Sequence, residues 1–415
     1  MLPYANARNE VTANQLSSIE ALVCELRSQG SRYLTERVIR LYDDLAAPCQ
    51  ERMVVFGAGH LGRFVLPGLI ESGVDVISYC DNNTALLGQN IAGIPIVSPT
   101  EAIARYGDSA AFLVAIYNAT AVKAQLHELG CPRIIPYPVA FGKFSVAFGD
   151  QRLALPDKIL EHTDAIVVAY ALLSDDKSRS EFAAQVRWRC SLDYSCLPNA
   201  DSNEEIYFPA DLVRMSPSEV LADGGAFDGD TIRAFIRKRG GHFKHVYAIE
   251  PDARSRAELE RYVRSLPQQD ASRIDVLPYG LGRSDGRVRF AADGTLASRL
   301  ELTGSSEVEI RTLDNICAGK HCPTFVKMDI EGAELDAISG AAQTISRCRP
   351  VMAICAYHRC SDLWVIPMLL KEMCSDYRIF LRRYAEECWE TVYYAIPPER
   401  LLAPTGECEE KCNEE

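Results

Sequence analysis

The sequence has neither a long hydrophobic run nor an excess of basic residues. No stretch approaches the roughly 18 consecutive apolar residues that a transmembrane helix needs, and the first residues, MLPYANARNE, lack the basic region and apolar core of a secretory signal. The formal net charge of -13 repels nucleic-acid phosphates and anionic membranes. We therefore expect a cytoplasmic protein that binds neither nucleic acid nor membranes and acts on a small-molecule acceptor.

Paired cysteine motifs are also missing. The chain has 15 cysteines, but no two CxxC motifs form a zinc framework, and several cysteines, such as Cys80 and Cys355, lie inside apolar runs. We expect most of them to be reduced, buried thiols. Asp329 and Glu331 are an unconvincing pair of metal ligands, because nearby residues at a strand end alternate in direction. We therefore assign no metal site.

The remaining composition is that of a globular protein, and 415 residues predict two or three domains. Strand-like and helical runs alternate in two separate regions, which indicates parallel strands joined by crossover helices. The predicted fold class is therefore α/β, with two tandem Rossmann-like three-layer domains. The predicted segments are N-terminal helices (1–48), a first Rossmann-like domain (49–140), a helical connector with one long helix over about 157–187 (141–215), a second α/β domain (216–400) and an acidic tail (401–415).

The stretch VLADGGAFDGDT, residues 220–231, forms a glycine-rich turn between a predicted strand and a helix. Gly224, Gly225 and Gly229 permit a sharp turn and a close approach of a ligand to backbone N–H groups. Asp223 adds a carboxylate at the end of the strand. The pattern by itself is also compatible with a purely structural corner.

Glu250 strengthens the binding interpretation, because it ends the next strand, HVYAI, about 20 residues after the turn. A doubly wound sheet presents a carboxylate to a ribose at this position. Asp223 would repel a pyrophosphate but suits a positively charged ligand. S-adenosylmethionine has a sulfonium, an ammonium group and a ribose without phosphate, so it fits this turn better than NAD does.

Charged residues also follow the later strands of this domain. VKMDIEGAE, residues 326–334, places Lys327, Asp329 and two glutamates at one strand end, where ligands bind in open α/β sheets. For the glutamates, capping of the next helix is an equally good interpretation. His358 follows the strand VMAIC and is either structural or a general base. Lys327, Asp329 and His358 are the three candidates for a catalytic residue.

Five segments together resemble the FkbM family of S-adenosylmethionine-dependent methyltransferases: LADGGAFDGDT, YAIEPD, VKMDIEGAE, CAYHRCSDLWVIPMLLKEM and YRIFLRRYAEECWETVYYAIP. The resemblance covers roughly residues 205–397. It implies a class I methyltransferase fold and methylation of an oxygen on a sugar or secondary metabolite. It further implies that the turn binds the methionine part of the cofactor, that Glu250 binds its ribose and that Asp329 faces the reacting centre. The predicted cofactor-binding residues are Asp223, Gly224, Gly225, Ala226, Phe227, Asp230, Thr231, Glu250, Pro251 and Gly280.

A second glycine-rich turn, VVFGAGHLGR, lies in the first domain and has the spacing of a dinucleotide-binding fingerprint. The region also resembles the nucleotide-binding domains at the front of bacterial sugar acyltransferases. A nucleotide or nucleotide-sugar site, an NAD site and a purely structural turn all remain open. The predicted nucleotide-binding residues are Gly57, Gly59, His60, Leu61, Gly62 and Asp81.

The leading hypothesis is an S-adenosylmethionine-dependent O-methyltransferase that acts on a hydroxyl of a saccharide or secondary metabolite. One alternative is an oxidoreductase or epimerase-like protein that acts through an NAD or nucleotide-sugar site in the first domain. That alternative lacks a hydride-transfer constellation, since residues 50–150 contain no YxxxK pair. The other alternative is a non-catalytic scaffold that binds a nucleotide-sugar.

Overall fold

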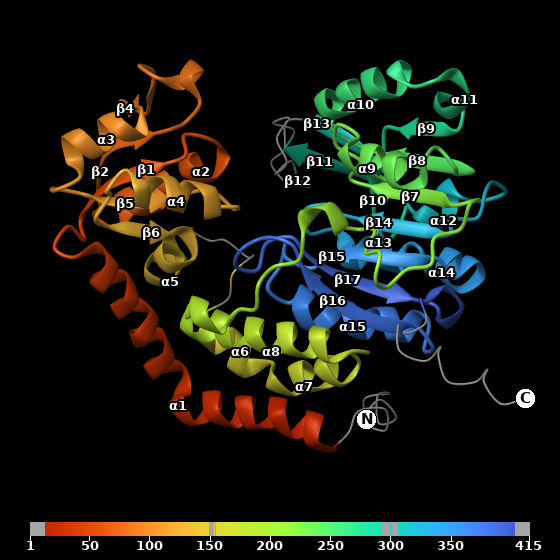
Figure 1. Cartoon of the computed structure of the whole chain (residues 1–415), viewed down its shortest axis with the longest axis horizontal. Helices are drawn as coiled ribbons and strands as arrows, with labels where there is room; N and C mark the ends of the chain where they lie inside the picture. Colours follow the sequence, from red (N-terminus) through yellow and green to blue (C-terminus); the bar gives the residue numbers. More distant parts are fainter. Residues whose placement is uncertain (1–12, 149–152, 154, 292–298, 301–305, 403–415) are drawn as a thin grey trace, which may run out of the picture. The chain divides into compact units, whose positions relative to one another are not determined.

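The computed structural model describes residues 13–148, 153, 155–291, 299–300 and 306–402 (Figure 1). The start of the predicted N-terminal helices and residues 403–415 of the predicted acidic tail lie outside this part of the chain. The described chain forms two compact units. The first unit contains the chain up to Asp201 with Ala356–Val365 and Leu381–Thr391, and the second contains Ser202–Cys355, Ile366–Phe380 and the chain from Val392.

The first unit is built on a six-stranded sheet of order β3-β4-β2-β1-β5-β6. Its pairs are parallel except for β3 and β4, which form an antiparallel hairpin. The order reverses at β1, so that β2 and β5 lie on either side of it. The strands are β1 (Arg52–Phe56), β2 (Asp75–Cys80), β3 (Asn90–Ile91), β4 (Ile94–Val97), β5 (Ala111–Val114) and β6 (Ile134–Pro136).

Strand β1 shows how the layers of the first unit arise, because its alternate side chains enter two different cores. Val55 packs in a core that includes Val65 of α2 (His60–Glu71). Val54 packs in a separate core that includes Ala102 of α3 (Pro99–Tyr106) and Leu126 of α4 (Thr120–Glu128). Helices therefore cover both faces of the sheet, as the alternation of strands and helices predicts.

The predicted long helix over about 157–187 is three shorter helices in the structure. They are α6 (Pro156–Glu161), α7 (Thr163–Ala171) and α8 (Asp176–Ser191). The α6–α7 junction has a non-helical residue, His162, with φ -112° and ψ 17°. Asp175 is extended and its side chain accepts the N–H of Ser178, which starts α8 as a new helix. The other helices of this unit are α1 (Ala13–Ala46) and α5 (Tyr137–Phe148).

The second unit is built on a seven-stranded sheet of order β16-β17-β15-β14-β7-β8-β9. The pairs from β15 to β9 are parallel, and β17 runs antiparallel to β15. The strands are β7 (Val220–Gly224), β8 (His245–Ile249), β9 (Ile274–Leu277), β14 (Phe325–Met328), β15 (Val351–Cys355), β16 (Arg378–Arg383) and β17 (Thr391–Ile396). The order reverses at β7, so that the carboxyl ends of β7 and β14 flank a crevice in which α/β proteins bind ligands.

Seven helices and a small second sheet complete the described part of this unit. The helices are α9 (Asp230–Arg239), α10 (Ala253–Ser265), α11 (Gln268–Ala271), α12 (Leu313–Ile316), α13 (Glu334–Ser339), α14 (Ala342–Cys348) and α15 (Asp362–Met373). The strands of the small sheet are β10 (Gly280–Leu281), β11 (Gly286–Ala291), β12 (Arg299–Leu300) and β13 (Ser306–Arg311). The prediction of an α/β protein with two Rossmann-like domains is confirmed.

One cysteine pair departs from the expectation of reduced thiols. Cys322 and Cys348 form a disulfide bond, whereas the other described cysteines are not disulfide-bonded. No helix among the described residues combines the length and the apolar character that crossing a membrane requires.

Candidate active site

The crevice beside β7 is bounded by the ends of neighbouring parallel strands. In the sheet register, Asp223 on β7 lies directly beside Lys327 on β14 and Ala248 on β8. Glu250 and Asp329 directly follow β8 and β14. Parallel strands end at the same edge, so the fold brings Asp223, Glu250, Lys327 and Asp329 to one end of the sheet.

Asp223 and Lys327 form a buried ion pair at the base of this crevice. Lys327 Nζ lies 3.1 Å from Asp223 Oδ1, and the two side chains are 2% and 0% exposed. Burial raises the pKa of Asp223, and the nearby ammonium group opposes that rise. Burial disfavours the charged form of Lys327, but three carboxylates, those of Asp223, Asp329 and Asp230, outweigh it and raise its pKa. Lys327 is therefore a protonated group at neutral pH and is poorly suited to act as a base.

Lys327 also braces the glycine turn. Its Nζ donates hydrogen bonds to the carbonyl oxygens of Gly225 at 2.7 Å and Gly224 at 3.3 Å. The ammonium group thus neutralises Asp223 and holds the turn from the side of the sheet. The contact of Asp223 with the cofactor stays a prediction. The ion pair of its carboxylate with Lys327 gives it a structural role beside the turn.

The glycines of this turn are required by close packing. A Cβ atom at Gly225, whose φ is +73°, would lie 1.9 Å from the carbonyl oxygen of Asp329. A Cβ at Gly224 would lie 2.7 Å from Leu281 of β10, which begins at Gly280. Phe227 has a positive φ of 46° without being glycine. The turn is therefore a tightly packed corner whose strained residue, Phe227, lies where the resemblance predicts a ligand.

Glu250 connects this turn to the next one. The N–H of Phe227 donates to Glu250 Oε2 and the N–H of Asp252 donates to Oε1, both at 2.8 Å. Glu250 is 6% exposed, and burial raises its pKa to about 7 even though both N–H groups oppose the rise. Pro251 lies between Glu250 and Asp252. Glu250 therefore occupies the predicted ribose position as a carboxyl group that gains or loses its proton near neutral pH.

The other predicted cofactor residues lie at the start of α9 and within the turn. Ala226 and Thr231 are buried, whereas Asp230 is exposed. Asp230 Oδ1 accepts the N–H of Thr231 at 2.6 Å.

Asp329 has a partner that the sequence did not reveal. Tyr207 donates its hydroxyl to Asp329 Oδ2 at 2.8 Å, and the Lys327 ammonium lies 5.2 Å from the centre of the Tyr207 ring. Tyr207 is 7% exposed, and its own N–H donates to the hydroxyl of Tyr394 on β17. Tyr207 lies in the segment predicted as a connector. The only signal for it in the sequence was its aromatic side chain within a polar stretch.

Glu334 is 1% exposed and its Oε1 accepts the N–H of Ile330, a loop residue before α13, at 2.9 Å. Its bond therefore closes the loop, and the predicted capping of α13 is wrong, because that helix has no side-chain cap. His358 belongs to the part of the chain that packs with the first unit. It is 5% exposed, and its ring lies 4.2 Å from that of Tyr357. Asp329 and His358 remain candidates for the base.

The first glycine turn shows three different uses of glycine. Gly57 has φ +106°, and a Cβ there would lie 2.8 Å from the carbonyl oxygen of Ala115, the residue after β5. A Cβ at Gly62 would lie 1.8 Å from the Gly57 oxygen, because α2 packs directly on the turn. Gly59 is exposed and a Cβ there would meet no atom within 4 Å. The fold therefore explains Gly57 and Gly62 but not Gly59.

Asp81 closes the same turn from β2. Its Oδ2 accepts the N–H of Ala58 and its Oδ1 accepts that of Asn83, both at 2.8 Å. Leu61 is buried in the core below α2, and the ring of His60 stacks on Phe64. Asp81 thus has the same double role at the first turn that Glu250 has at the second.

Comparison with known proteins relates part of the chain to a known family. Residues 223–387 match the methyltransferase FkbM domain. The match covers 165 of the 415 residues. A 2-O-methyltransferase, NoeI of Sinorhizobium fredii, is 29% identical over 157 residues, which are 32% of this chain and 61% of that protein. The chain thus matches somewhat less than two thirds of this relative.

A solved structure is similar over both units. The methyltransferase FkbM of Methylobacillus flagellatus KT superimposes with a TM-score of 0.67 and 26% identity, covering 92% of this chain and 99% of that one. These matches confirm the predicted FkbM domain and support a methyltransferase. The predicted resemblance of the first domain to sugar acyltransferases stays a prediction.

Replacing Lys327 with methionine should destabilise the protein strongly. Lys327→Met leaves the Asp223 carboxylate buried without its counter-ion, and loss of one partner from a buried pair costs about 3–5 kcal/mol. Urea unfolding followed by circular dichroism measures this change. The double variant Asp223→Asn, Lys327→Met should recover much of the loss, because it removes the stranded charge. A single variant as stable as the wild type would contradict the buried pair.

Gly59 and Gly62 of the first turn should respond differently to alanine. Gly62→Ala places a Cβ against the Gly57 oxygen and should lower the free energy of unfolding by about 1–3 kcal/mol or more. Gly59→Ala meets open space and should leave the unfolding temperature unchanged. Differential scanning calorimetry of both variants checks this, and equal losses would show that the turn is packed differently.

Proposed function

We propose that the FkbM domain is an S-adenosylmethionine-dependent O-methyltransferase whose acceptor is a hydroxyl group of a saccharide or secondary metabolite. The observation that carries the proposal is Glu250, a buried carboxyl group directly after β8, within the segment that matches the FkbM domain, whose Oε2 accepts the N–H of Phe227 in the strained turn. The relative NoeI, named as a 2-O-methyltransferase, supports oxygen as the methylated atom.

The residues at the crevice fit this cofactor. Glu250 would bind the two ribose hydroxyls in its ionised form, and the turn from Gly224 to Phe227 would run along the methionine part. The Asp223–Lys327 pair is neutral overall, so the site does not attract a diphosphate through a free ammonium group. When bound, the cofactor supplies a methyl group that is already activated by its sulfonium.

The protein then has to align the acceptor hydroxyl and take up its proton. Asp329 is suited to this role, because it lies at the crevice and one of its oxygens is held by the Tyr207 hydroxyl. This bond fixes the orientation of the carboxylate. His358 is the alternative base.

For the first domain we propose a nucleotide or nucleotide-sugar ligand, with NAD as the alternative. The supporting observation is Gly59, the glycine of the fingerprint whose Cβ position is open, at the start of α2. A nucleotide-sugar would explain why this domain is joined to a methyltransferase, because it could present a saccharide. Titration calorimetry with a uridine diphosphate sugar and with NADH distinguishes the two ligands, and Gly59→Ala should weaken whichever binds.

The central experiment follows transfer of labelled methyl from S-adenosylmethionine to a panel of mono- and oligosaccharides. The wild type should bind the cofactor and methylate a member of the panel at a hydroxyl. Asp329→Asn should retain cofactor binding but lose about 100- to 10,000-fold in kcat, the usual contribution of a general base. Absence of cofactor binding by the wild type would refute the proposal, and an unimpaired Asp329→Asn variant would transfer the base role to His358.

Cofactor affinity should increase with pH around neutrality. The pKa of Glu250, raised to about 7 by burial, favours the protonated form in the free protein. This group therefore stabilises the fold most at low pH, and that contribution is lost as pH rises through about 7. Ribose binding needs the ionised form, so affinity should rise from about pH 6 to about pH 8. Calorimetric titrations should show this rise in the wild type and a weaker, pH-independent affinity in Glu250→Gln.

A further inference from the structure

Two loops of the methyltransferase sheet pack with the first unit. They are Ala356–Val365, which follows β15, and Leu381–Thr391, which begins at the end of β16 and leads into β17. The N–H of Ala356 donates to the carbonyl oxygen of Thr391 at 2.8 Å, which ties the two loops together. Loops after parallel strands line the ligand site of α/β sheets. Ala356 directly follows Cys355, the last residue of β15, so the first loop begins at the sheet edge where β14 also ends.

Helix α8 presents an unusual buried face to these loops. Ser178, Glu181, Gln185 and Arg189 are spaced by three, four and four residues, so that they lie on one side of the helix. Their exposed fractions are 0%, 6%, 0% and 2%. A buried helix face is normally apolar, and each polar group here is costly unless it is hydrogen-bonded. We call these four residues the α8 ladder.

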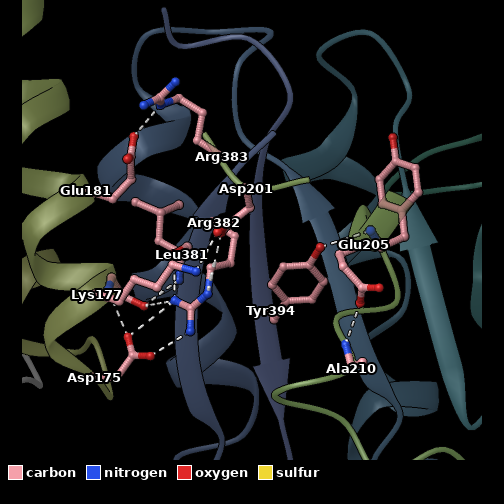
Figure 2. Close-up of polar contacts among 12 residues, drawn as sticks. Asp175, Lys177, Glu181, Asp201, Glu205, Ala210, Leu381, Arg382, Arg383 and Tyr394 are labelled. Carbon is pink, nitrogen blue, oxygen red and sulfur yellow. Dashed lines mark hydrogen bonds and ion pairs between the residues drawn. The ribbon is translucent and has the colours of Figure 1, made fainter. Parts of the chain in front are cut away.

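The first half of the α8 ladder holds the end of β16 (Figure 2). Ser178 Oγ accepts the N–H of Leu381 at 2.8 Å and Nη1 of Arg382 at 2.9 Å. Glu181 Oε1 accepts Nε of Arg383 at 2.7 Å. Figure 2 shows the Arg382 and Arg383 side chains directed at different positions along α8. Both arginines are 3% exposed, so the two pairs are shielded from solvent.

The second half of the α8 ladder holds the end of the second loop, at Thr391. Gln185 Nε2 donates to Glu181 Oε1 at 2.8 Å and to Thr391 Oγ1 at 3.0 Å. Arg189 Nη1 donates to Gln185 Oε1 at 2.8 Å. Burial raises the pKa of the Cys360 thiol to about 11, and the charge of the nearby Arg189 guanidinium opposes that rise. Hydrogen bonds thus link Arg383, Glu181, Gln185 and Arg189 in one series that branches to Thr391.

We propose that the α8 ladder positions the two loops for methyl transfer, and that Gln185 and Thr391 are positioning residues for the reaction. This inference rests on the proposed function. Buried polar pairs add little stability over apolar packing of the same volume, but their directional bonds fix one geometry among several compact ones. The α8 ladder is therefore a feature that sets loop geometry, and helix α8 is a working part of the methyltransferase rather than a connector.

The test uses the bond between Gln185 and Thr391. Thr391→Val keeps the shape of the side chain but removes the hydroxyl that accepts from Gln185 and donates to the Cys388 carbonyl. Thr391→Ser keeps that hydroxyl and serves as the matched control. Gln185→Leu removes the bond from the other side, so that the inference does not depend on one variant folding.

In the full-length protein, Thr391→Val and Gln185→Leu should lower kcat by about 10- to 100-fold, as expected for reacting groups displaced by a fraction of an ångström to an ångström. Cofactor affinity should be unchanged, because the turn and Glu250 belong to the second unit. Thr391→Ser should restore kcat. Wild-type kcat in both Thr391→Val and Gln185→Leu, or an equal loss of kcat in Thr391→Ser, would overturn the inference.

A second measurement is independent of the acceptor. The imidazole resonances of His358, assigned by comparison with His358→Gln, should shift in Thr391→Val and Gln185→Leu and return to their wild-type positions in Thr391→Ser. Unshifted resonances in the first two variants would overturn the inference even if no acceptor were turned over. A wild type that fails to bind the cofactor would instead refute the proposed function, so the two failures are distinguishable.

Discussion

The ion pair between Asp223 and Lys327 is the interaction on which the active edge of the second unit depends. The two residues lie side by side on β7 and β14, where the order of the sheet reverses. Their charges cancel in a place without solvent, and the lysine uses its remaining hydrogen bonds to hold the carbonyl groups of the glycine turn. The turn therefore stays packed against the end of β14.

The same arrangement explains how the fold divides its charged groups. Lys327 has a structural role, because the neighbouring carboxylates keep its ammonium group protonated. The carboxyl groups of Glu250 and Asp329 instead accept hydrogen bonds, from the N–H of Phe227 and from the Tyr207 hydroxyl. Among the described residues, Glu250 accepts hydrogen bonds from two backbone N–H groups. Its carboxyl group can therefore gain or lose a proton without breaking an ion pair. Such differences between neighbouring carboxylates distinguish groups that hold a site together from groups that can react.

The fold class and part of the candidate site could be predicted from the sequence. The apolar runs and the glycine turns fixed the fold class, because strand and helix periods are local properties. The sequence could place the glycine turn, Glu250 and Asp329 at one edge, because a parallel sheet brings strand ends together wherever they lie in the chain. The single long helix over about 157–187 was wrong, because apolar periodicity does not register a local cap such as Asp175.

By itself, the sequence determined two α/β domains and the strand ends that carry the candidate site residues, since both follow from short-range patterns. Only the tertiary structure decided what those residues contact. It paired Asp223 with a lysine 104 positions away, gave Asp329 the Tyr207 hydroxyl, and turned the polar face of α8 towards two loops of the other domain's sheet. The physical reason is that the charge state and orientation of a buried polar group depend on neighbours that are distant in the chain.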